Sequence, residues 1–254
     1  MLNELRSALN TGKGLELHYQ PQVLPTNGRV VGCEALIRWI KPQGESIAPD
    51  VFIPLAEYTG LIVEIGDWVF AEACRQIVQW DRSGLPAFRV GINISAAQFR
   101  ETDFVAKIAS AIEMSGVDPA RLELEITESV AMEDPESVAR QLRELKALGL
   151  RVAVDDFGCG FSSLGSLNRL PFDRIKIDRA FVRELTPSTS QDCIARIIIK
   201  LAKSLGLDVI AEGVETAEQS RLLEEMGCRE MQGFLYGRPM HADALASWVG
   251  GNPA

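Results

Sequence analysis

Short apolar segments alternate with amphipathic ones along almost the whole chain. Eight of them have the residue pattern of β-strands: 15–24, 30–39, 89–95, 122–128, 151–155, 174–178, 208–212 and 229–235. Helical patterns lie between them, notably over 63–82, 102–115, 134–147, 189–205 and 216–226. Eight strands separated by helices, in a chain of 254 residues, are typical of a (β/α)8 barrel. We therefore predict an α/β protein of the TIM-barrel type, with residues 1–254 as a single domain.

The first two strand segments depart from this rhythm. Only Pro25–Arg29 separates them, and the Asn27-Gly28 dipeptide within that stretch is common in tight hairpins. A parallel crossover needs roughly a dozen residues or more. Because the connection is so short, we predict a modified barrel whose first strand is antiparallel to the second.

Composition excludes several classes of protein. A formal net charge of −9 and the absence of a Lys/Arg-rich run argue against general nucleic-acid binding. No apolar segment is long enough for a membrane span, and five scattered cysteines are typical of reduced thiols, so we expect a cytoplasmic location. His18 and His241 lie near opposite ends of the chain. We therefore expect no paired-histidine site, and expect His18 to be a packed, hydrogen-bonded residue.

Each strand segment divides into an apolar face and a polar face. In 122–128, Glu123, Glu125 and Thr127 alternate with apolar residues, and Lys176 alternates with isoleucines in the same way. The apolar faces are suited to packing beneath outer helices, so the polar faces should point into the barrel. Eight polar residues then lie in the middle of the strands or towards their C-terminal ends, where such barrels carry active sites: Glu34, Asn93, Glu125, Asp155, Asp156, Lys176, Glu212 and Gln232.

Five of these eight residues are acids and only Lys176 is a cation. Crowded carboxylates repel one another or take up protons unless cations compensate them. Oxygen ligands with one amide suit Mg²⁺ or Mn²⁺, so we expect a metal site in the barrel mouth. The alternative for the adjacent Asp155 and Asp156 is a solvated turn, with Asp156 capping a helix. For both acids to reach the mouth, we expect the strand to end at Asp155.

These residues lie within recognisable motifs. The motifs are, in order, "YQPQV", "CEALIRW", "FIPLAE", "NIS", "LEITES", "DDFGCGFSSL", "IKIDRAFV", "AEGVET" and "QGFLYGRPM". Together they resemble those of the bacterial EAL-domain cyclic di-GMP phosphodiesterases. The resemblance covers residues 5–248, and the barrel of that family also opens with an antiparallel strand.

The resemblance implies two bound divalent ions, Mg²⁺ or Mn²⁺, and hydrolysis of cyclic di-GMP to linear pGpG by two-metal activation of water. It implies that the first ion is bound by Glu34, Asn93, Glu125 and Asp155. Asp155, Asp156 and Glu212 would bind the second. Lys176 corresponds to the catalytic lysine, and either it or Glu212 takes the proton from water. From the residues alone, Lys176 could equally be a counter-charge for Glu125 or Asp178.

The resemblance also implies roles around the metal site. Gln20, Arg38 and Gln232 correspond to substrate contacts, although Arg38 alone could form a surface ion pair and Gln232 could be a core amide. The residues that correspond to supports of a mobile loop and of a dimer contact are Thr127, Glu128, Phe157, Gly158 and Glu215. The chain departs from the family at Cys159, Phe161 and Gly237, where hydroxyl-bearing residues are more usual. Loss of the first two hydroxyls could loosen that loop.

The family implies a homodimer as partner besides cyclic di-GMP, and often fusion to sensory or diguanylate-cyclase domains. Two other functions compete with hydrolysis of cyclic di-GMP. One is a non-catalytic cyclic di-GMP receptor or interaction module, although such domains usually lack some of the metal ligands. The other is an enolase-type lyase, which also combines carboxylate-bound Mg²⁺ with a lysine. The Asp155-Asp156 pair, Asn93 and the ordered motifs favour the phosphodiesterase.

Overall fold

A computed structural model of the chain describes residues 1–41, 44–158, 169–188, 190 and 193–251. Its strands form one sheet, in the order β1-β9-β8-β7-β6-β5-β4-β2-β3, that closes because β1 also pairs with β2. The short β3 pairs with the end of β2. The strands are β1 (Leu15–Leu24), β2 (Arg29–Ile40), β3 (Ser46–Ile47), β4 (Arg89–Asn93), β5 (Leu122–Thr127), β6 (Arg151–Phe157), β7 (Arg174–Ile177), β8 (Asp208–Ala211) and β9 (Glu230–Gln232).

The direction of the first strand is as predicted. β1 is antiparallel to both of its barrel neighbours, β2 and β9, whereas the pairs from β2 through β4 to β9 are parallel. In the hairpin, the N–H of Gly28 donates to the carbonyl of Leu24 at 2.8 Å. Gly28 has a φ of 70°, a left-handed conformation that glycine adopts without steric cost. The tight turn therefore sets the unusual direction of β1.

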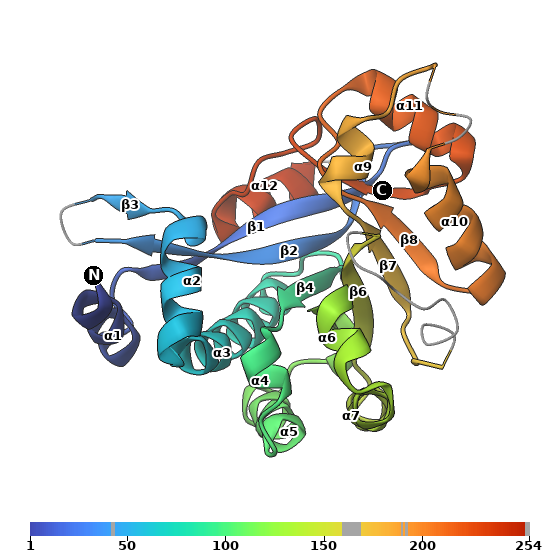
Figure 1. Ribbon diagram of the computed structural model, residues 1–254. Helices are drawn as coiled ribbons and strands as arrows, with labels where there is room; N and C mark the ends of the chain where they lie inside the picture. The colour runs from blue at the N-terminus through green and yellow to red at the C-terminus, as the bar shows by residue number, and fades with distance from the viewer. Residues whose placement is uncertain (42–43, 159–168, 189, 191–192, 252–254) are drawn as a thin grey trace.

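Helices surround the outside of the sheet (Figure 1). The predicted helices correspond to α3, α5, α7, α10 and α11, and the C-caps of the last two, Gly206 and Gly227, are left-handed. The helical segments are α1 (Leu2–Thr11), α2 (Pro49–Thr59), α3 (Leu61–Arg82), α4 (Ala96–Phe99), α5 (Phe104–Ser115), η1 (Pro119–Arg121), α6 (Glu128–Glu133), α7 (Pro135–Ala147), α9 (Arg179–Arg183), α10 (Ile194–Leu205), α11 (Ala217–Met226) and α12 (Ala242–Gly251).

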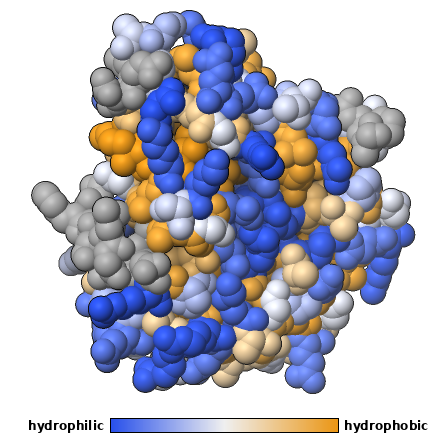
Figure 2. All heavy atoms as spheres, turned by 90° about the vertical axis from the view of Figure 1, so that its right-hand side faces the viewer, coloured by the Kyte–Doolittle hydropathy of each residue, from blue (hydrophilic) through white to orange (hydrophobic). Residues whose placement is uncertain are grey.

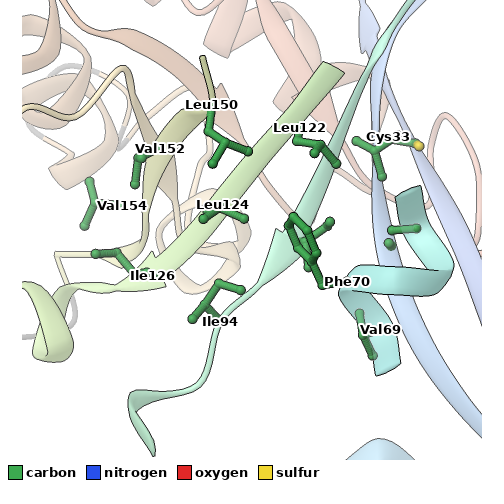
Figure 3. Packing of buried hydrophobic residues seen from close by; sticks show 14 of the residues in the cluster. Cys33, Val69, Phe70, Ile94, Leu122, Leu124, Ile126, Leu150, Val152 and Val154 are labelled. Carbon is green, nitrogen blue, oxygen red and sulfur yellow. The ribbon is translucent and has the colours of Figure 1, made fainter. Parts of the chain in front are cut away.

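The apolar faces of the strands form the core between the sheet and the helices. Leu124 of β5 is paired in register with Val152 of β6, and both belong with Leu122 and with Phe70 of α3 to one cluster of buried side chains (Figure 3). The polar residues of the same strands take the opposite face: Glu123 and Glu125 have 1% of their surface exposed, although both are acids. The predicted division of the strands into two faces is thus confirmed.

The end of β6 differs from the prediction. The strand continues to Phe157 rather than ending at Asp155, and its pairing with β7 shifts between Val154 and Phe157. Within this irregular stretch Asp156 has a φ of 53°. A bulge re-aims the side chains of its strand without ending it, which is why strict alternation could not locate the turn.

The barrel interior also holds ion pairs that the sequence analysis did not identify. Arg174 of β7 is fully buried, with Nη1 at 3.2 Å from a carboxylate oxygen of Glu123 and Nη2 at 2.7 Å from one of Glu230. These residues lie towards the beginnings of their strands, away from the predicted mouth. A buried guanidinium needs such partners because desolvation of a charge is costly.

The outside of the molecule is mixed in character. Figure 2 faces the side on which α10 and α11 lie, where hydrophilic residues gather in the middle and hydrophobic residues lie in patches beside them. On α10, Ile194 and Ile197 are 45% and 62% exposed. Among the described residues, no helix has both the length and the apolar character that crossing a membrane requires.

Candidate active site

Lys176 is the centre of the predicted mouth. Its ammonium group lies 2.7 Å from Glu212, 3.2 Å from Asp155 and 3.9 Å from Glu34. It also donates a short hydrogen bond to Glu125. These acids come from four different strands or strand ends, and Lys176 is 1% exposed. The structure thus brings together the predicted catalytic residues Lys176, Glu212 and Glu34.

The electrostatics of the mouth are unbalanced. Four carboxylates surround one ammonium group, so full ionisation would leave three negative charges in excess. Burial raises the pKa of Glu212 to about 8 and that of Glu125 well above its usual value, although Lys176 opposes both shifts. Burial would lower the pKa of Lys176, but the surrounding acids raise it well above its ordinary value. Lys176 is therefore charged at neutral pH, and the mouth needs further cations to keep its acids ionised.

A chain of amide hydrogen bonds closes one side of the mouth. Gln232 Nε2 donates to Glu34 Oε2 at 2.5 Å and to Gln20 Oε1 at 3.1 Å. Asn93 Nδ2 donates to the other oxygen of Glu34 at 2.6 Å, and Gln20 Nε2 donates to the carbonyl of Gly237 at 3.1 Å. Gln20 and Gln232 are buried. Two predicted substrate contacts and two predicted metal ligands therefore share one hydrogen-bonded group.

The two adjacent aspartates have different surroundings. Asp155 contacts Lys176, and one of its oxygens accepts the N–H of Asp156 at 2.9 Å. Asp156 is more exposed, and burial together with Asp155 and Asp178 raises its pKa to about 6. Asp155 thus belongs to the cluster around Lys176, whereas Asp156 lies at its edge.

Arg38 lies next to the mouth in a pocket of about 300 Å³, which Asn93, Glu125 and Thr127 also line. The guanidinium is half-buried and donates to the carbonyl of Ile37 at 2.8 Å. Burial lowers the pKa of Arg38, while Glu34 and Glu16 act in the opposite direction. A half-buried guanidinium facing this pocket is suited to binding a phosphate oxygen.

The predicted loop supports lie in three places: at the end of β6, where β5 meets α6, and after β8. The N–H of Gly158 donates to Glu128 Oε2 at 2.7 Å, and Phe157 is buried. Thr127 precedes α6 and lines the pocket beside Arg38, whereas Glu215 lines a separate hollow with Arg179. Cys159 and Phe161 lie outside the described residues.

The sequence analysis missed one cluster near the mouth. The rings of His18 and His241 have centroids 4.3 Å apart, and His18 Nε2 lies 2.9 Å from Glu16 Oε1. The expected hydrogen bond of His18 is present, and the two histidines lie side by side although they are far apart in the sequence. Distance along the chain is no guide here, because α12 packs beside β1 in the closed barrel.

The donor groups of the mouth fit hard divalent cations. Carboxylate and amide oxygens are the ligands that Mg²⁺ and Mn²⁺ prefer, and Glu125 Oε1 is buried without a hydrogen-bond partner. The mouth acids nevertheless converge on Lys176 rather than on one another. Within the part of the chain that the structure describes, three ligand atoms lie within 4.8 Å of one another only at Glu16, His18 and His241.

Comparison with known proteins identifies the family. The model of the EAL domain matches residues 2–239. The chain is an EAL domain. Its fold superimposes on the solved PaMucR phosphodiesterase in complex with c-di-GMP with a TM-score of 0.91, at 45% identity, covering 96% of this chain and 98% of that one. The EAL domain of FimX from Pseudomonas aeruginosa, at 23% identity and a TM-score of 0.84, shares the fold.

Curated relatives of this EAL domain are longer proteins. The bifunctional diguanylate cyclase/cyclic di-GMP phosphodiesterase MucR of Pseudomonas aeruginosa is 45% identical over 98% of this chain, which covers 36% of MucR. The cyclic di-GMP phosphodiesterase PA2567 of the same organism is 40% identical over 98% of this chain, which covers 42% of it. The chain therefore spans less than half the length of these relatives.

Proposed function

We propose that this EAL domain is a phosphodiesterase that hydrolyses cyclic di-GMP to linear pGpG. The buried cluster of four acids around Lys176 carries the proposal, because it unites on one inner face the residues that such chemistry requires. Membership of the EAL family and the similarity to relatives named as cyclic di-GMP phosphodiesterases support it.

In this proposal two divalent ions, Mg²⁺ or Mn²⁺, are bound in the mouth. Glu34, Asn93, Glu125 and Asp155 would hold the first, and Asp155, Asp156 and Glu212 the second. Such a pair of ions lowers the pKa of water and stabilises negative charge on the phosphoryl oxygens. The excess negative charge around Lys176 is the physical reason for this requirement, since a bare acidic mouth would repel a substrate with two phosphodiester charges.

The protein residues then divide the remaining work. Lys176 is protonated at neutral pH, so we assign it the role of donor that orients the attacking water rather than that of base. We assign the role of proton acceptor to the ionised carboxylate of Glu212, because it lies 2.7 Å from the ammonium group of Lys176. Arg38 would bind a phosphate oxygen from its pocket, while Gln20 and Gln232 would exchange their mutual hydrogen bond for contacts with the substrate.

The test is incubation of the protein with cyclic di-GMP and Mg²⁺ or Mn²⁺, with chromatographic separation of the products. We expect metal-dependent pGpG that disappears with excess EDTA and in Glu34→Ala, but persists in Glu218→Ala, where an exposed acid on α11 is removed. Tight binding without product would replace the proposal by the receptor function. If the protein shows no binding of cyclic di-GMP and forms no product, both the phosphodiesterase and the receptor function are refuted.

The wider context of the domain remains a prediction. These relatives are longer than this chain, and fusion to sensory or diguanylate-cyclase domains is consistent with the share of their length that it spans. A homodimer is the other expectation, and Ile194 and Ile197 give α10 an exposed apolar surface that a partner could cover. Sedimentation velocity with Ile197→Glu tests it, because a charge at this position should shift a dimer to monomer.

A further inference from the structure

Glu16, His18 and His241 form a cluster outside the proposed mouth ligands. Glu16 Oε1 lies 2.9 Å from His18 Nε2 and 4.0 Å from His241 Nδ1, and all three ligand atoms lie within 4.8 Å of one another. A tetrahedral ion with bonds of about 2.0–2.2 Å to nitrogen and oxygen needs ligand atoms roughly 3.3–3.5 Å apart. The observed spacings lie on both sides of that value, so small side-chain rotations suffice to bring the three atoms onto one ion.

Rigid backbone holds the two histidines together. His18 lies within the β1–β2 ladder, opposite Leu36. His241 follows Met240, which pairs with Tyr19 through two backbone hydrogen bonds of 2.7 and 3.0 Å. The carbonyl of His241 then accepts the N–H groups that begin α12. The ligand-bearing positions are therefore fixed by regular structure rather than by a loose surface loop, and this favours a defined metal geometry.

We propose that Glu16, His18 and His241 form a binding site for a transition-metal ion of the Zn²⁺ class, distinct from the proposed Mg²⁺ or Mn²⁺ site. Two imidazoles and one carboxylate are a donor set that binds Zn²⁺ and leaves a further coordination position open. The mouth offers oxygen donors instead, so the chemistry of the two sites separates the two classes of ion. His241 is 67% exposed at its side chain, which gives an ion access from solvent.

The site lies on the same face of β1 as the mouth. Glu16, His18 and Gln20 are every second residue of β1, so their side chains share that face. Glu16 is paired in register with Arg38 of β2. The charges of Arg38 and Glu16 interact electrostatically. The positive charge of Arg38 opposes that of a bound ion, so we expect an affinity for Zn²⁺ below that of a closed structural zinc site.

The composition of the chain makes the test unusually direct, because His18 and His241 are its only histidines. Protein without a histidine tag, labelled with ¹⁵N at histidine, gives two sets of imidazole signals in NMR spectra. The protein is first saturated with Mg²⁺ and then titrated with Zn²⁺. We expect one equivalent of Zn²⁺ to shift both sets of signals together, whereas Mg²⁺ leaves them in place.

Variants separate this site from the mouth. The measured quantity is the Zn²⁺ concentration at which half of the change in the imidazole signals has occurred. In Glu16→Gln this concentration should rise at least tenfold. In His241→Ala it should rise at least tenfold for the remaining His18 signal. The matched control Glu218→Gln should behave as the unaltered protein, and circular dichroism checks that each variant is folded. The proposal is overturned if one equivalent of Zn²⁺ moves neither imidazole, or if the shifts persist unchanged in both site variants. No substrate is used, so failure here is distinguishable from failure of the proposed hydrolysis.

Discussion

Gly91→Ala tests whether the position of Glu125 matters, by a change that adds one methyl group beside it. Gly91 lies on β4, on the same inner face as Asn93. A Cβ atom built on Gly91 lies 2.1 Å from Glu125 Oε1, against the 3.4 Å at which ordinary contacts begin. Carbon–oxygen contacts much shorter than 3.4 Å are repulsive, so the carboxylate must move by about 1.3 Å to restore an ordinary contact. Glu125 is buried and accepts a hydrogen bond from Lys176, so the displacement disturbs that hydrogen bond.

Two quantities follow from this displacement. Forcing a methyl group into a packed interior costs about 1–3 kcal/mol of unfolding free energy, which urea denaturation measures. A displacement of about 1 Å in a catalytic group lowers turnover on the order of 100-fold. We therefore expect kcat/KM for cyclic di-GMP to fall at least tenfold in Gly91→Ala and the Mg²⁺ requirement to rise.

Gly250→Ala is the matched control for this experiment, because a Cβ atom there has open space around it. Gly250→Ala should change kcat/KM by less than about twofold and the free energy of unfolding by less than about 0.5 kcal/mol. A folded Gly91→Ala protein with unchanged kcat/KM and unchanged Mg²⁺ requirement would show that the place of Glu125 is immaterial to the reaction. The assignment of Glu125 as a metal ligand would then be wrong.

Two further predictions concern the interior charges. The pKa of Glu212 is raised from 4.5 to about 8, so the folded state binds the extra proton between these values. Without divalent ions, the unfolding free energy should therefore fall as the pH rises from 5 to 8, and Glu212→Gln should flatten the urea-denaturation profile. Arg174→Met leaves Glu123 and Glu230 without their shared partner and should cost about 3–5 kcal/mol in the same assay. Arg75→Met, which removes an exposed pair, should cost less than about 1 kcal/mol.

Local chemistry explains how much of the fold could be predicted from the sequence. Alternation of residue types located the eight barrel strands, and the tight turn at Gly28 located the reversal of β1, because both signals depend only on neighbouring residues. The bulge at Asp156 could not be found in this way. It depends on the pairing of β6 with β7, a contact between distant segments.

The candidate site shows the same division. The motifs and the parity of the strands selected the acids that gather around Lys176, and every one of these acids lies at that cluster or at its edge. The salt-bridge partners of Arg174 and the pairing of His18 with His241 were missed. Each of those interactions depends on which strands become neighbours when the barrel closes. The placement of a residue on the inner face was predictable, but its partner across the barrel was not.

Among the described residues, β9 has the fewest paired residues of the eight barrel strands. β9 joins β1 through Gln22↔Gln232 and Val23↔Met231, and it joins β8 through two pairs as well, whereas ten pairs hold β1 to β2. Thermal opening of the barrel should therefore begin at β9, and the backbone amides of β9 should exchange with deuterium before those of β5 and β6. The side-chain amide of Gln232 on β9 donates a hydrogen bond to Gln20 on β1. A ligand bound by both side chains would therefore link the two strands and stabilise their pairing. Binding of a ligand in the mouth should then slow amide exchange along β9.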